Sequence, residues 1–416
     1  MSDGWLNGRW GAACVLVVVC LAGGCGQSEG ERPSGAWPVY RGPNRDGIST
    51  ETGWLARWPE GGPKVLWKTN VGVGYSCVSV RDGRLYTMGN RDNKDTVFCL
   101  DAGTGAELWT TPYDCPAGEN PGTRATPTLD GNRVYSISRD EQLFCLDAET
   151  GGELWSQDLR KTVGGRPPYW GYACSPVVLG RMLILQVGAK DGAVAALDKT
   201  DGKLIWKSGE GIGSYSTPTV YEADGKTRLA VFLGDGVVAL DAETGEQLWK
   251  FPVKAKWNLT ITDPIVVDDK VFVSAGYGAG AVLLQVTDGE PKPVWQTVEF
   301  SNHYTTSILW KGHLYGIDGD VERKPFLKCY EFATGVEKWS HKGLGKGSLM
   351  LADGKLIIMG ETGELVVAEA SPDGYKELAR AKVLTGRCWT MPVLAGGRIY
   401  CRSHEGDLVC LDVSRR

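Results

Sequence analysis

Short apolar runs separated by polar turns recur along the chain from about residue 63 to its end. In one pattern an apolar run is followed by Asp, a Thr-Gly or Asp-Gly pair, and a second run that closes on Trp, as in LDAETGEQLW at 240–249. Copies lie at 100–109, 146–155 and 197–206, with a looser one at 330–339. Asp accepts backbone N–H bonds in such a turn and Gly adopts the positive φ of a bulged loop, so each copy predicts a β-hairpin.

The tryptophan that ends the pattern keeps a nearly constant spacing. The repeat tryptophans are Trp67, Trp109, Trp155, Trp206, Trp249, Trp295 and Trp339, and successive ones are 42 to 51 residues apart. A side chain at a fixed register points to a fixed face of its strand. We therefore expect these indoles to pack in the same way and to serve a structural role.

A second pair of apolar runs precedes each hairpin, which gives four short strands in about 45 residues, the size of one propeller blade. The strand pairs begin near Cys77, Ala125, Ser175, Thr217, Asp263, Thr305, Gly347 and Met391. The sequence thus predicts an all-β fold, a single eight-bladed β-propeller of four-stranded blades.

The last blade lacks a strand, because the chain ends at 409–416 without the usual Gly and Trp. An apolar run at 63–72 carries Trp67 but has no blade in front of it. We expect this N-terminal strand to complete the last blade and close the ring, which removes free sheet edges. The seventh blade is degenerate, since Leu378 stands four residues after Gly374 where Trp is expected.

The repeated TG-x-x-x-W motif, over about residues 63–416, resembles the pyrroloquinoline-quinone (PQQ) repeat. That repeat occurs in quinoprotein dehydrogenases and in non-catalytic eight-bladed lipoproteins similar to the outer-membrane assembly factor BamB. The motif is specific for the fold and says little about activity. A WD-repeat interpretation fails because no Trp is followed by Asp.

The residues before the repeats divide into two segments. Residues 1–24 are predicted to be a signal peptide of the lipoprotein type: the apolar run 11–22 is too short to span a membrane comfortably, and small residues precede Cys25 as in a lipobox. Cys25 is then the lipidated residue, and the alternative is ordinary signal-peptidase cleavage.

Residues 25–62 form a tether and a leader, in which Trp37 and Tyr40 are expected to pack on the ring. A ligand-binding role for Arg41 or Asp46 is the alternative reading of the leader. Residues 63–416 form the propeller.

Charge and cysteine content narrow the classes of function. A net charge of −5 and a pI near 5.6 give no electrostatic footprint for nucleic acid.

Twelve Cys in an exported chain suggest disulfides. However, Cys99, Cys145, Cys329 and Cys410 share a repeat position that is Ala in blades three and four, which indicates a small buried slot. The other five Cys of the propeller allow at most two bridges. Only four His occur, without metal-ligand spacing, so no metal site is predicted.

The loops that lead into the innermost strands of a propeller converge at one end of its axis. These loops offer a candidate face for a ligand or a partner, consisting of Tyr75, Arg124, Tyr172, Tyr215, Trp257, Asn258, His303, Tyr304, Lys346, Arg387 and Trp389. Cationic and aromatic side chains from separate blades would form a cradle for an anionic or planar ligand. The alternative is that they only cap the channel.

The resemblance also implies what a quinoprotein enzyme of this fold requires. Those dehydrogenases hold the quinone against a vicinal Cys pair and a calcium ion bound by carboxylate and amide side chains, with an Asp as base. This sequence has no adjacent Cys pair, and Asn258 and Asp263 are not joined by a Glu in their loop. No catalytic residue is therefore assigned and no cofactor is expected, with PQQ and calcium as the alternative.

These observations favour a non-catalytic envelope lipoprotein, anchored by lipid to a membrane and facing the periplasm. Its propeller would be a monomeric scaffold for an envelope protein or a cell-wall component, and assembly of outer-membrane proteins is the most specific version. No nucleic-acid partner is expected. The alternatives are a PQQ-dependent dehydrogenase and a non-catalytic ligand sensor.

Overall fold

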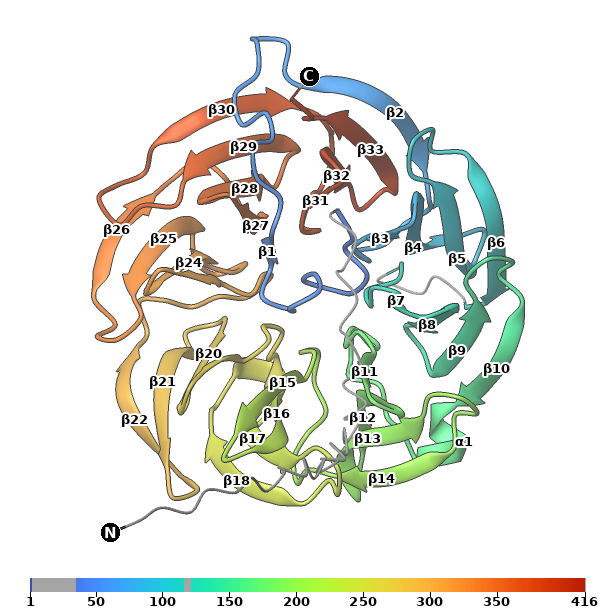
Figure 1. Cartoon of the computed structure of the whole chain (residues 1–416), viewed down its shortest axis with the longest axis vertical. Coiled ribbons are helices and arrows are strands. Elements are labelled where there is room, and N and C mark those ends of the chain that lie inside the picture. The colour runs from blue at the N-terminus through green and yellow to red at the C-terminus, as the bar shows by residue number, and fades with distance from the viewer. Residues whose placement is uncertain (2–34, 116–120, 416) are drawn as a thin grey trace. The chain divides into compact units, whose positions relative to one another are not determined.

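Eight β-sheets are arranged radially around a central axis, as Figure 1 shows. The structure is a computed structural model that describes Met1, residues 35–115 and residues 121–415. The predicted signal peptide, the tether up to residue 34 and the lipidation site Cys25 lie outside the described residues. The eight-bladed propeller of four-stranded blades is the fold that the sequence predicts.

Blades one to seven run from an inner strand to an outer strand in chain order, whereas blade eight takes its outer strand from the beginning of the propeller sequence. Blade one contains β3 (Ser79–Arg81), β4 (Arg84–Arg91), β5 (Lys94–Asp101) and β6 (Glu107–Asp114). Blade two contains β7 (Thr128–Asp130), β8 (Arg133–Ile137), β9 (Gln142–Asp147) and β10 (Glu153–Asp158), and is followed by α1 (Leu159–Val163). Blade three contains β11 (Val177–Leu179), β12 (Met182–Ala189), β13 (Gly192–Asp198) and β14 (Leu204–Ser208). Blade four contains β15 (Thr219–Ala223), β16 (Lys226–Leu233), β17 (Gly236–Asp241) and β18 (Gln247–Pro252).

The second half of the ring repeats this order. Blade five follows the 3₁₀-helix η1 (Lys256–Asn258) and contains β19 (Ile265–Val267), β20 (Lys270–Ala275), β21 (Gly280–Thr287) and β22 (Glu290–Thr297). Blade six contains β23 (Ile308–Trp310), β24 (His313–Asp318), β25 (Phe326–Glu331) and β26 (Glu337–His341). Blade seven contains β27 (Ser348–Ala352), β28 (Lys355–Met359), β29 (Glu364–Glu369) and β30 (Glu377–Lys382). Blade eight contains β31 (Val393–Ala395), β32 (Arg398–Arg402), β33 (Asp407–Asp412) and β2 (Lys64–Asn70).

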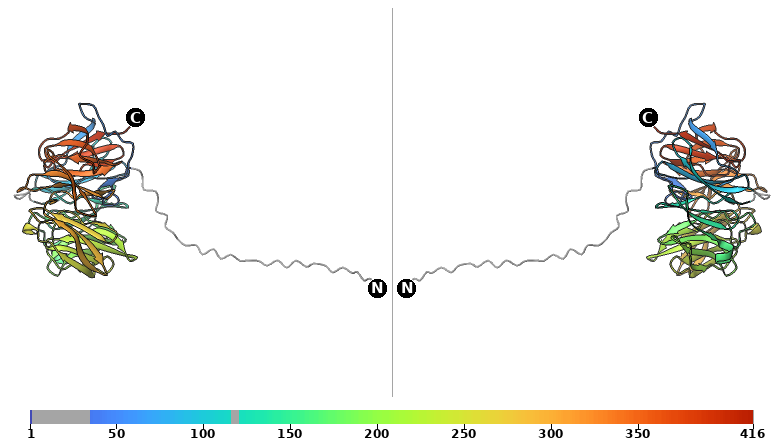
Figure 2. Two further views of the ribbon diagram at one scale, coloured as in Figure 1. Left: turned by 90° about the vertical axis from the view of Figure 1, so that its left-hand side faces the viewer. Right: turned by 90° about the vertical axis from the view of Figure 1, so that its right-hand side faces the viewer.

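Burial differs between the middle and outer strands of a blade. In β5 the six residues Asp95 to Leu100 are all buried, because neighbouring blades cover both faces of the sheet. In β6 exposed and half-buried residues alternate, because this strand borders the solvent. The core therefore consists of contacts between blades rather than one central cluster. Seen edge-on in Figure 2, the loops of the blades gather on two opposite faces of the ring.

The N-terminal strand closes the ring, as predicted. β2 pairs antiparallel with β33, and Trp67 lies opposite Cys410 in this register. The order β2-β33-β32-β31 gives blade eight its four strands from the two ends of the propeller sequence.

The repeat tryptophans join neighbouring blades. Each indole N–H except that of Trp249 donates to a backbone carbonyl in the next blade, for example Trp67 to Ala102 at 3.1 Å and Trp206 to Ala242 at 3.2 Å. Gly105, at φ +75°, lies so close to Trp67 that an added Cβ would be 2.6 Å from the indole ring. The common packing of the indoles is confirmed for six of the seven, and the Gly of the motif is needed for both its φ and its size.

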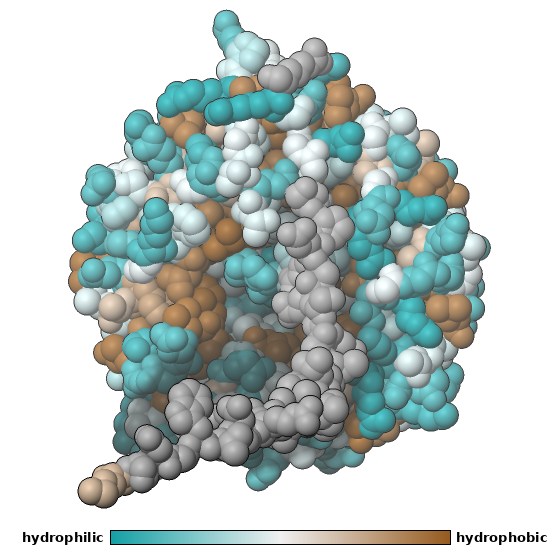
Figure 3. Space-filling view, viewed as in Figure 1, coloured by the Kyte–Doolittle hydropathy of each residue, from teal (hydrophilic) through white to brown (hydrophobic). Residues whose placement is uncertain are grey.

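The leader crosses the centre of the ring, where Figure 1 shows it in blue. Trp37 is 1% exposed and exchanges backbone hydrogen bonds with Val80 of blade one. The two-residue strand β1 (Ile48–Ser49) adds a fifth, parallel strand to the inner edge of blade seven. The expected packing of Trp37 and Tyr40 on the ring is confirmed. Figure 3, drawn from the same side, shows mostly hydrophilic side chains on the outer rim and apolar ones beside the central hollow, over β20 and β24.

The nine cysteines in the described part of the chain are all buried and free. The prediction that Cys99, Cys145, Cys329 and Cys410 fill small buried slots is confirmed. Among the described residues, no helix is long and apolar enough to cross a membrane.

Candidate binding site at the mouth of the ring

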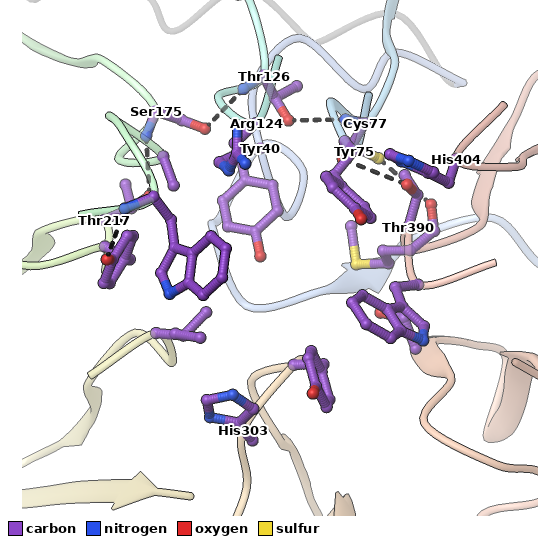
Figure 4. A pocket seen from close by; sticks show the side chains of 18 of the residues that line it. Tyr40, Tyr75, Cys77, Arg124, Thr126, Ser175, Thr217, His303, Thr390 and His404 are labelled. Carbon is purple, nitrogen blue, oxygen red and sulfur yellow. Dashed lines mark hydrogen bonds between the residues drawn. The ribbon is translucent and has the colours of Figure 1, made fainter. Parts of the chain in front are cut away.

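A cavity of about 590 Å³ lies on the ring axis, and Figure 4 shows its walls. Seven of the eleven residues of the candidate face line it, namely Tyr75, Arg124, Tyr215, His303, Tyr304, Arg387 and Trp389. They come from blades one, two, four, six and eight, so the loops do converge as the propeller geometry requires. Whether they bind a ligand or a partner stays a prediction.

Hydrogen bonds between adjacent blades hold the cavity wall in place. In blades two to six, the side chain of the residue two positions before the inner strand accepts a backbone N–H from the preceding blade. Cys77 N donates to Thr126 Oγ1 (3.1 Å), Thr126 N to Ser175 Oγ (3.0 Å), Ser175 N to Thr217 Oγ1 (3.1 Å), Thr217 N to Asp263 Oδ1 (2.7 Å) and Asp263 N to Thr306 Oγ1 (2.9 Å). Figure 4 draws the bonds that join Cys77, Thr126, Ser175 and Thr217 as dashed lines. Because the acceptors belong to different sheets, the wall is fixed by the ring and not by any single loop.

The leader lies beneath the cavity. Tyr40 lines it, and Arg41 is 3% exposed and donates to the backbone oxygens of Thr306 (3.2 Å) and Ser307 (3.1 Å). Arg41 Nε lies 3.8 Å from Asp263 Oδ2. Neither Arg41 nor Asp46 lines the cavity. Arg41 thus fastens the leader to blades five and six, and a ligand-binding role for either residue is not supported.

Six rings from four blades form one continuous aromatic wall. Successive ring centroids are 4.5 Å apart for His404 and Tyr75, 5.7 Å for Tyr75 and Trp389, 4.3 Å for Trp389 and Tyr304, 4.4 Å for Tyr304 and His303, and 4.8 Å for His303 and Tyr277. Contacts at these separations are favourable between aromatic rings. The wall offers a broad surface for apolar or planar groups.

Two arginines give the cavity a positive character. Arg387 donates from Nη1 to the Tyr75 hydroxyl at 3.1 Å, and its guanidinium lies 4.6 Å from the centre of the Trp389 ring. Arg124 lies 5.9 Å from the centre of the Tyr75 ring and donates to Gly122 O. Burial lowers the pKa of Arg124 from its usual value. Asp263 is the one carboxylate among the described lining residues.

Buried titratable groups face this cavity. Burial raises the pKa of Asp263 to about 6, partly offset by the positive charge of Arg41. His303 is 4% exposed, and its burial lowers its pKa to about 4, so the imidazole is neutral at pH 7. No protein group in the described part of the chain makes a hydrogen bond with the Nδ1 atoms of His303 and His404. These two nitrogens are unused hydrogen-bonding groups at the wall.

Four residues of the candidate face do not line the cavity. Tyr172 is a correction, because its ring is 1% exposed in the core and its hydroxyl donates to Val187 O at 2.8 Å. Trp257 and Asn258 lie in η1 outside the cavity, where Trp257 is 64% exposed and its ring lies 5.0 Å from that of Tyr277. Lys346 Nζ lies 3.9 Å from Glu361 Oε1 and 5.9 Å from the centre of the Trp389 ring, and Lys346 does not line the cavity.

Several lining residues were missed by the sequence analysis. Tyr277 and His404 lie between the second and third strands of blades five and eight, in loops that reach the same face as those considered. Tyr40 comes from the leader, and Trp170 lies in the same loop as Tyr172. Reading the loops between the second and third strands of each blade would have identified Tyr277 and His404.

The residues present do not fit the calcium-bound quinone that the resemblance implies. The nine described cysteines are all free, and Asn258 does not line the cavity that contains Asp263. No group of three or more His, Cys, Asp or Glu side chains in the described part of the chain could hold a metal ion. We therefore derive no catalytic step from this site.

Residues 93–341, which are more than half of the chain, match the family described as outer membrane protein assembly factor BamB. The chain belongs to this family. One relative is the outer membrane protein assembly factor BamB of Burkholderia pseudomallei (strain K96243), which is 30% identical over 230 residues, covering 53% of this chain and 58% of the relative. Another is the polyvinylalcohol dehydrogenase of Sphingopyxis sp. (strain 113P3), which is 31% identical over 147 residues, covering 32% of this chain and 21% of the relative. The chain thus spans less than two thirds of either curated relative.

Solved structures share the fold at low identity. BamB from Moraxella catarrhalis superposes with a TM-score of 0.62 at 15% identity, covering 84% of this chain and 99% of that one. Quinohemoprotein alcohol dehydrogenase from Comamonas testosteroni gives a TM-score of 0.68 at 14% identity, covering 92% of this chain and 81% of that one. Assembly factors and enzymes therefore share this propeller, and the fold does not decide between them.

Proposed function

We propose that this protein is a non-catalytic scaffold of the cell envelope that binds another protein through the mouth of its ring. Membership of the BamB family supports this role, and assembly of outer-membrane proteins is its most specific form. The observation that carries the proposal is an exposed apolar rim around the cavity, which we call the mouth rim. It consists of Tyr169, Trp170, Ile212, Trp257 and Val321, which are 80%, 37%, 48%, 64% and 60% exposed.

The mouth rim follows neighbouring blades. Trp170 precedes β11, Ile212 precedes β15, Trp257 precedes β19, and Val321 lies between β24 and β25. Lys256 and Glu322, which form an ion pair at 2.5 Å, join the Trp257 and Val321 ends of this surface. Exposed apolar side chains gathered in one place mark interaction surfaces, and aromatic residues often dominate the binding energy there. The aromatic residues Tyr169, Trp170 and Trp257 fit this description.

Affinity capture from solubilised envelope tests the proposal. Full-length tagged protein should recover a partner in a fixed ratio. The double variant Trp257→Ala with Val321→Ser should lose most of it, because truncating a central aromatic contact commonly costs 2 kcal/mol or more, on the order of 30-fold in affinity. The matched control is Leu154→Ser with Val336→Ser, which removes apolar side chains 49% and 53% exposed on β10 and before β26. Equal recovery by the two double variants would contradict docking at the mouth.

We also propose that the chain is exported and anchored through lipid on Cys25. The small residues directly before Cys25 support this proposal. Mass analysis of the mature N-terminus should find a diacylated Cys25, and Cys25→Ser should release the protein from the membrane fraction. An unmodified terminus elsewhere would show ordinary cleavage instead.

The similarity to polyvinylalcohol dehydrogenase supports a second candidate, a quinone-dependent oxidoreductase. Purified protein mixed with PQQ and calcium would then show quinone absorbance, a raised melting temperature and dye reduction with alcohols. A raised melting temperature without dye reduction would instead indicate a ligand sensor. Since the calcium ligands are not assembled, we expect none of these signals.

A further inference from the structure

We infer that the cavity receives an acidic, aromatic segment of the partner protein, in which one carboxylate lies beside aromatic or apolar side chains. This inference rests on the proposed function and specifies the chemistry of its partner. It concerns the interior of the cavity, whereas the proposed function depends on the exposed mouth rim.

The first argument is the aromatic wall. The six rings from His404 to Tyr277 are in contact through five successive pairs, so they present one surface and not isolated side chains. Trp257 extends this surface outward, because its ring lies 5.0 Å from that of Tyr277. An occupant can therefore contact apolar surface continuously from the cavity to the mouth rim.

The second argument is charge complementarity. Arg387 is exposed at the mouth, and its guanidinium makes no ion pair with a carboxylate in the described ranges. Asp263 is engaged by Thr217 N and Arg41 at the base of the cavity and is 7% exposed. The cavity is therefore positively charged, because its own carboxylate, Asp263, already has bonding partners within the protein. A carboxylate of the occupant would accept hydrogen bonds from Arg387, while an adjacent aromatic group of the occupant would pack against the rings of the wall.

The third argument is the buried imidazole of His303. Its ring belongs to the wall, it is 4% exposed, and its Nδ1 has no partner among the residues that the structure describes. This nitrogen packs against blade five, since an added Cβ at Gly276 would lie 2.6 Å from it. His303 therefore offers an occupant ring surface within the aromatic wall and not the Nδ1 atom.

The fourth argument is the shape of the site. The leader crosses the axis beneath the cavity and fastens to blades one, five, six and seven, so an occupant enters from the mouth. The apolar surface continues outside the cavity along the mouth rim. A loop tip or chain end that continues into a larger partner matches this arrangement better than a compact ligand that is fully enclosed.

Binding of short peptides tests the inference. The probes are N-acetylated, C-amidated hexapeptides with two Phe and one Asp or Glu, placed next to a Phe or one residue away from it. Matched panels replace the acid by Asn or Gln, or both Phe by Ser. Titration calorimetry on the full chain should show binding by acidic Phe peptides. Replacing the acid should cost at least tenfold, as expected when a charged hydrogen bond is removed, and replacing both Phe should cost at least as much, because their aromatic contact with the wall is lost.

Variants locate the bound peptide. Arg387→Gln should weaken the acidic peptides about tenfold and leave their Asn or Gln counterparts unchanged. Arg181→Gln is the matched control, because Arg181 is exposed in the turn between β11 and β12 at the other end of the inner strand. Trp389→Phe keeps a ring in the wall and should retain most of the binding. Unchanged melting temperatures would confirm that the variants fold.

Three results with the peptides would overturn the inference. Absence of binding by every peptide, equal binding by acidic and neutral panels, or equal effects of Arg387→Gln and Arg181→Gln would each do so. Binding of a tetramer of N-acetylglucosamine in place of the peptides would assign the cavity to a glycan. Failure of the envelope capture experiment, with peptides still bound, would remove the proposed partner role and leave the chemistry of the cavity intact.

Discussion

Burial shifts two titratable side chains at the cavity toward their neutral forms. For His303 this means a low pKa, about 4, and for Asp263 a high one, about 6. Asp320 and Lys346 also act on His303, in opposite directions. Because one group is a base and the other an acid, the same physical cause makes the stability of the ring depend on pH with opposite signs.

Replacing His303 with Gln should reduce the sensitivity of the fold to acid. Between pH 6.5 and pH 4 the unfolded chain binds a proton at this residue more readily than the folded chain does, so acidification destabilises the wild type. The shift corresponds to about 3 kcal/mol across this window. Urea unfolding at pH 7, 5.5 and 4 should show that the wild type loses about this much relative to His303→Gln. A constant difference between the two proteins would contradict the assigned pKa.

Asp263→Asn should show the reverse trend. The folded chain protonates Asp263 near pH 6 and the unfolded chain near its ordinary value of 3.8, so the wild type gains stability relative to the variant as the pH falls between these values. Asn retains an oxygen that can accept the N–H of Thr217, which limits other effects of the substitution. The same urea series measures this trend, and a parallel pH dependence in wild type and variant would exclude it.

The sequence located much of the site at this scale but not its electrostatics. Tyr75, Arg124 and Trp389 were found because the loop before each inner strand can be recognised from the repeat. Tyr172 was misplaced because its ring packs in the core, whereas the next residue, Ala173, lines the cavity. The shifted pKa values arise from burial created by several blades and the leader together, which no local pattern contains.

The contact between a repeat Trp and a repeat Gly is the unit that joins the blades. In blade four Gly245 has φ +77°, and an added Cβ would lie 2.7 Å from the ring of Trp206 in blade three. Blade five ends in a different hairpin, where Gly289 has φ +78° with no atom within 4 Å of an added Cβ. This difference accompanies the one repeat Trp, Trp249, whose indole nitrogen is buried without a partner in the described structure.

Comparison of Gly245→Ala with Gly289→Ala separates backbone strain from the contact between blades. Both substitutions place Ala in the left-handed region, which costs about 1–2 kcal/mol. Gly245→Ala also forces the Cβ against Trp206, which adds about 1–3 kcal/mol. Chemical denaturation should therefore show a larger loss for Gly245→Ala. Equal losses at the two positions would show that the indole moves aside at little cost.

The number of blades could be predicted because the Trp hairpin recurs at a nearly constant interval and survives local changes. Even blade seven, with Leu378 at the Trp position, keeps its four strands. The strand β1 could not be predicted in this way. It has only two residues, and its pairing with β27 depends on where the leader crosses the assembled ring.

Ring closure is a property of the whole molecule, because β2 joins the beginning of the propeller to β33 near the chain end. It was predictable because the last blade was one strand short and the first Trp strand had no blade of its own. The leader then crosses the ring beneath the cavity and contributes Tyr40 to its lining.

The special position of β2 leads to a final prediction. Trp67 and Trp206 are similarly buried, at 8% and 9% exposure, and both donate to a carbonyl of the next blade. Either Ala variant should lose about 3–5 kcal/mol of unfolding free energy. However, β14, which carries Trp206, is held within a continuous chain on both sides, whereas β2 is joined to blade eight only by pairing with β33. Loosening β2 exposes the edge of β33, and free edges promote association between chains. Sedimentation velocity at increasing protein concentration should therefore detect oligomers for Trp67→Ala and monomers for Trp206→Ala. Identical sedimentation of the two variants would show that β2 stays paired without its indole and that closure depends on the strand backbone.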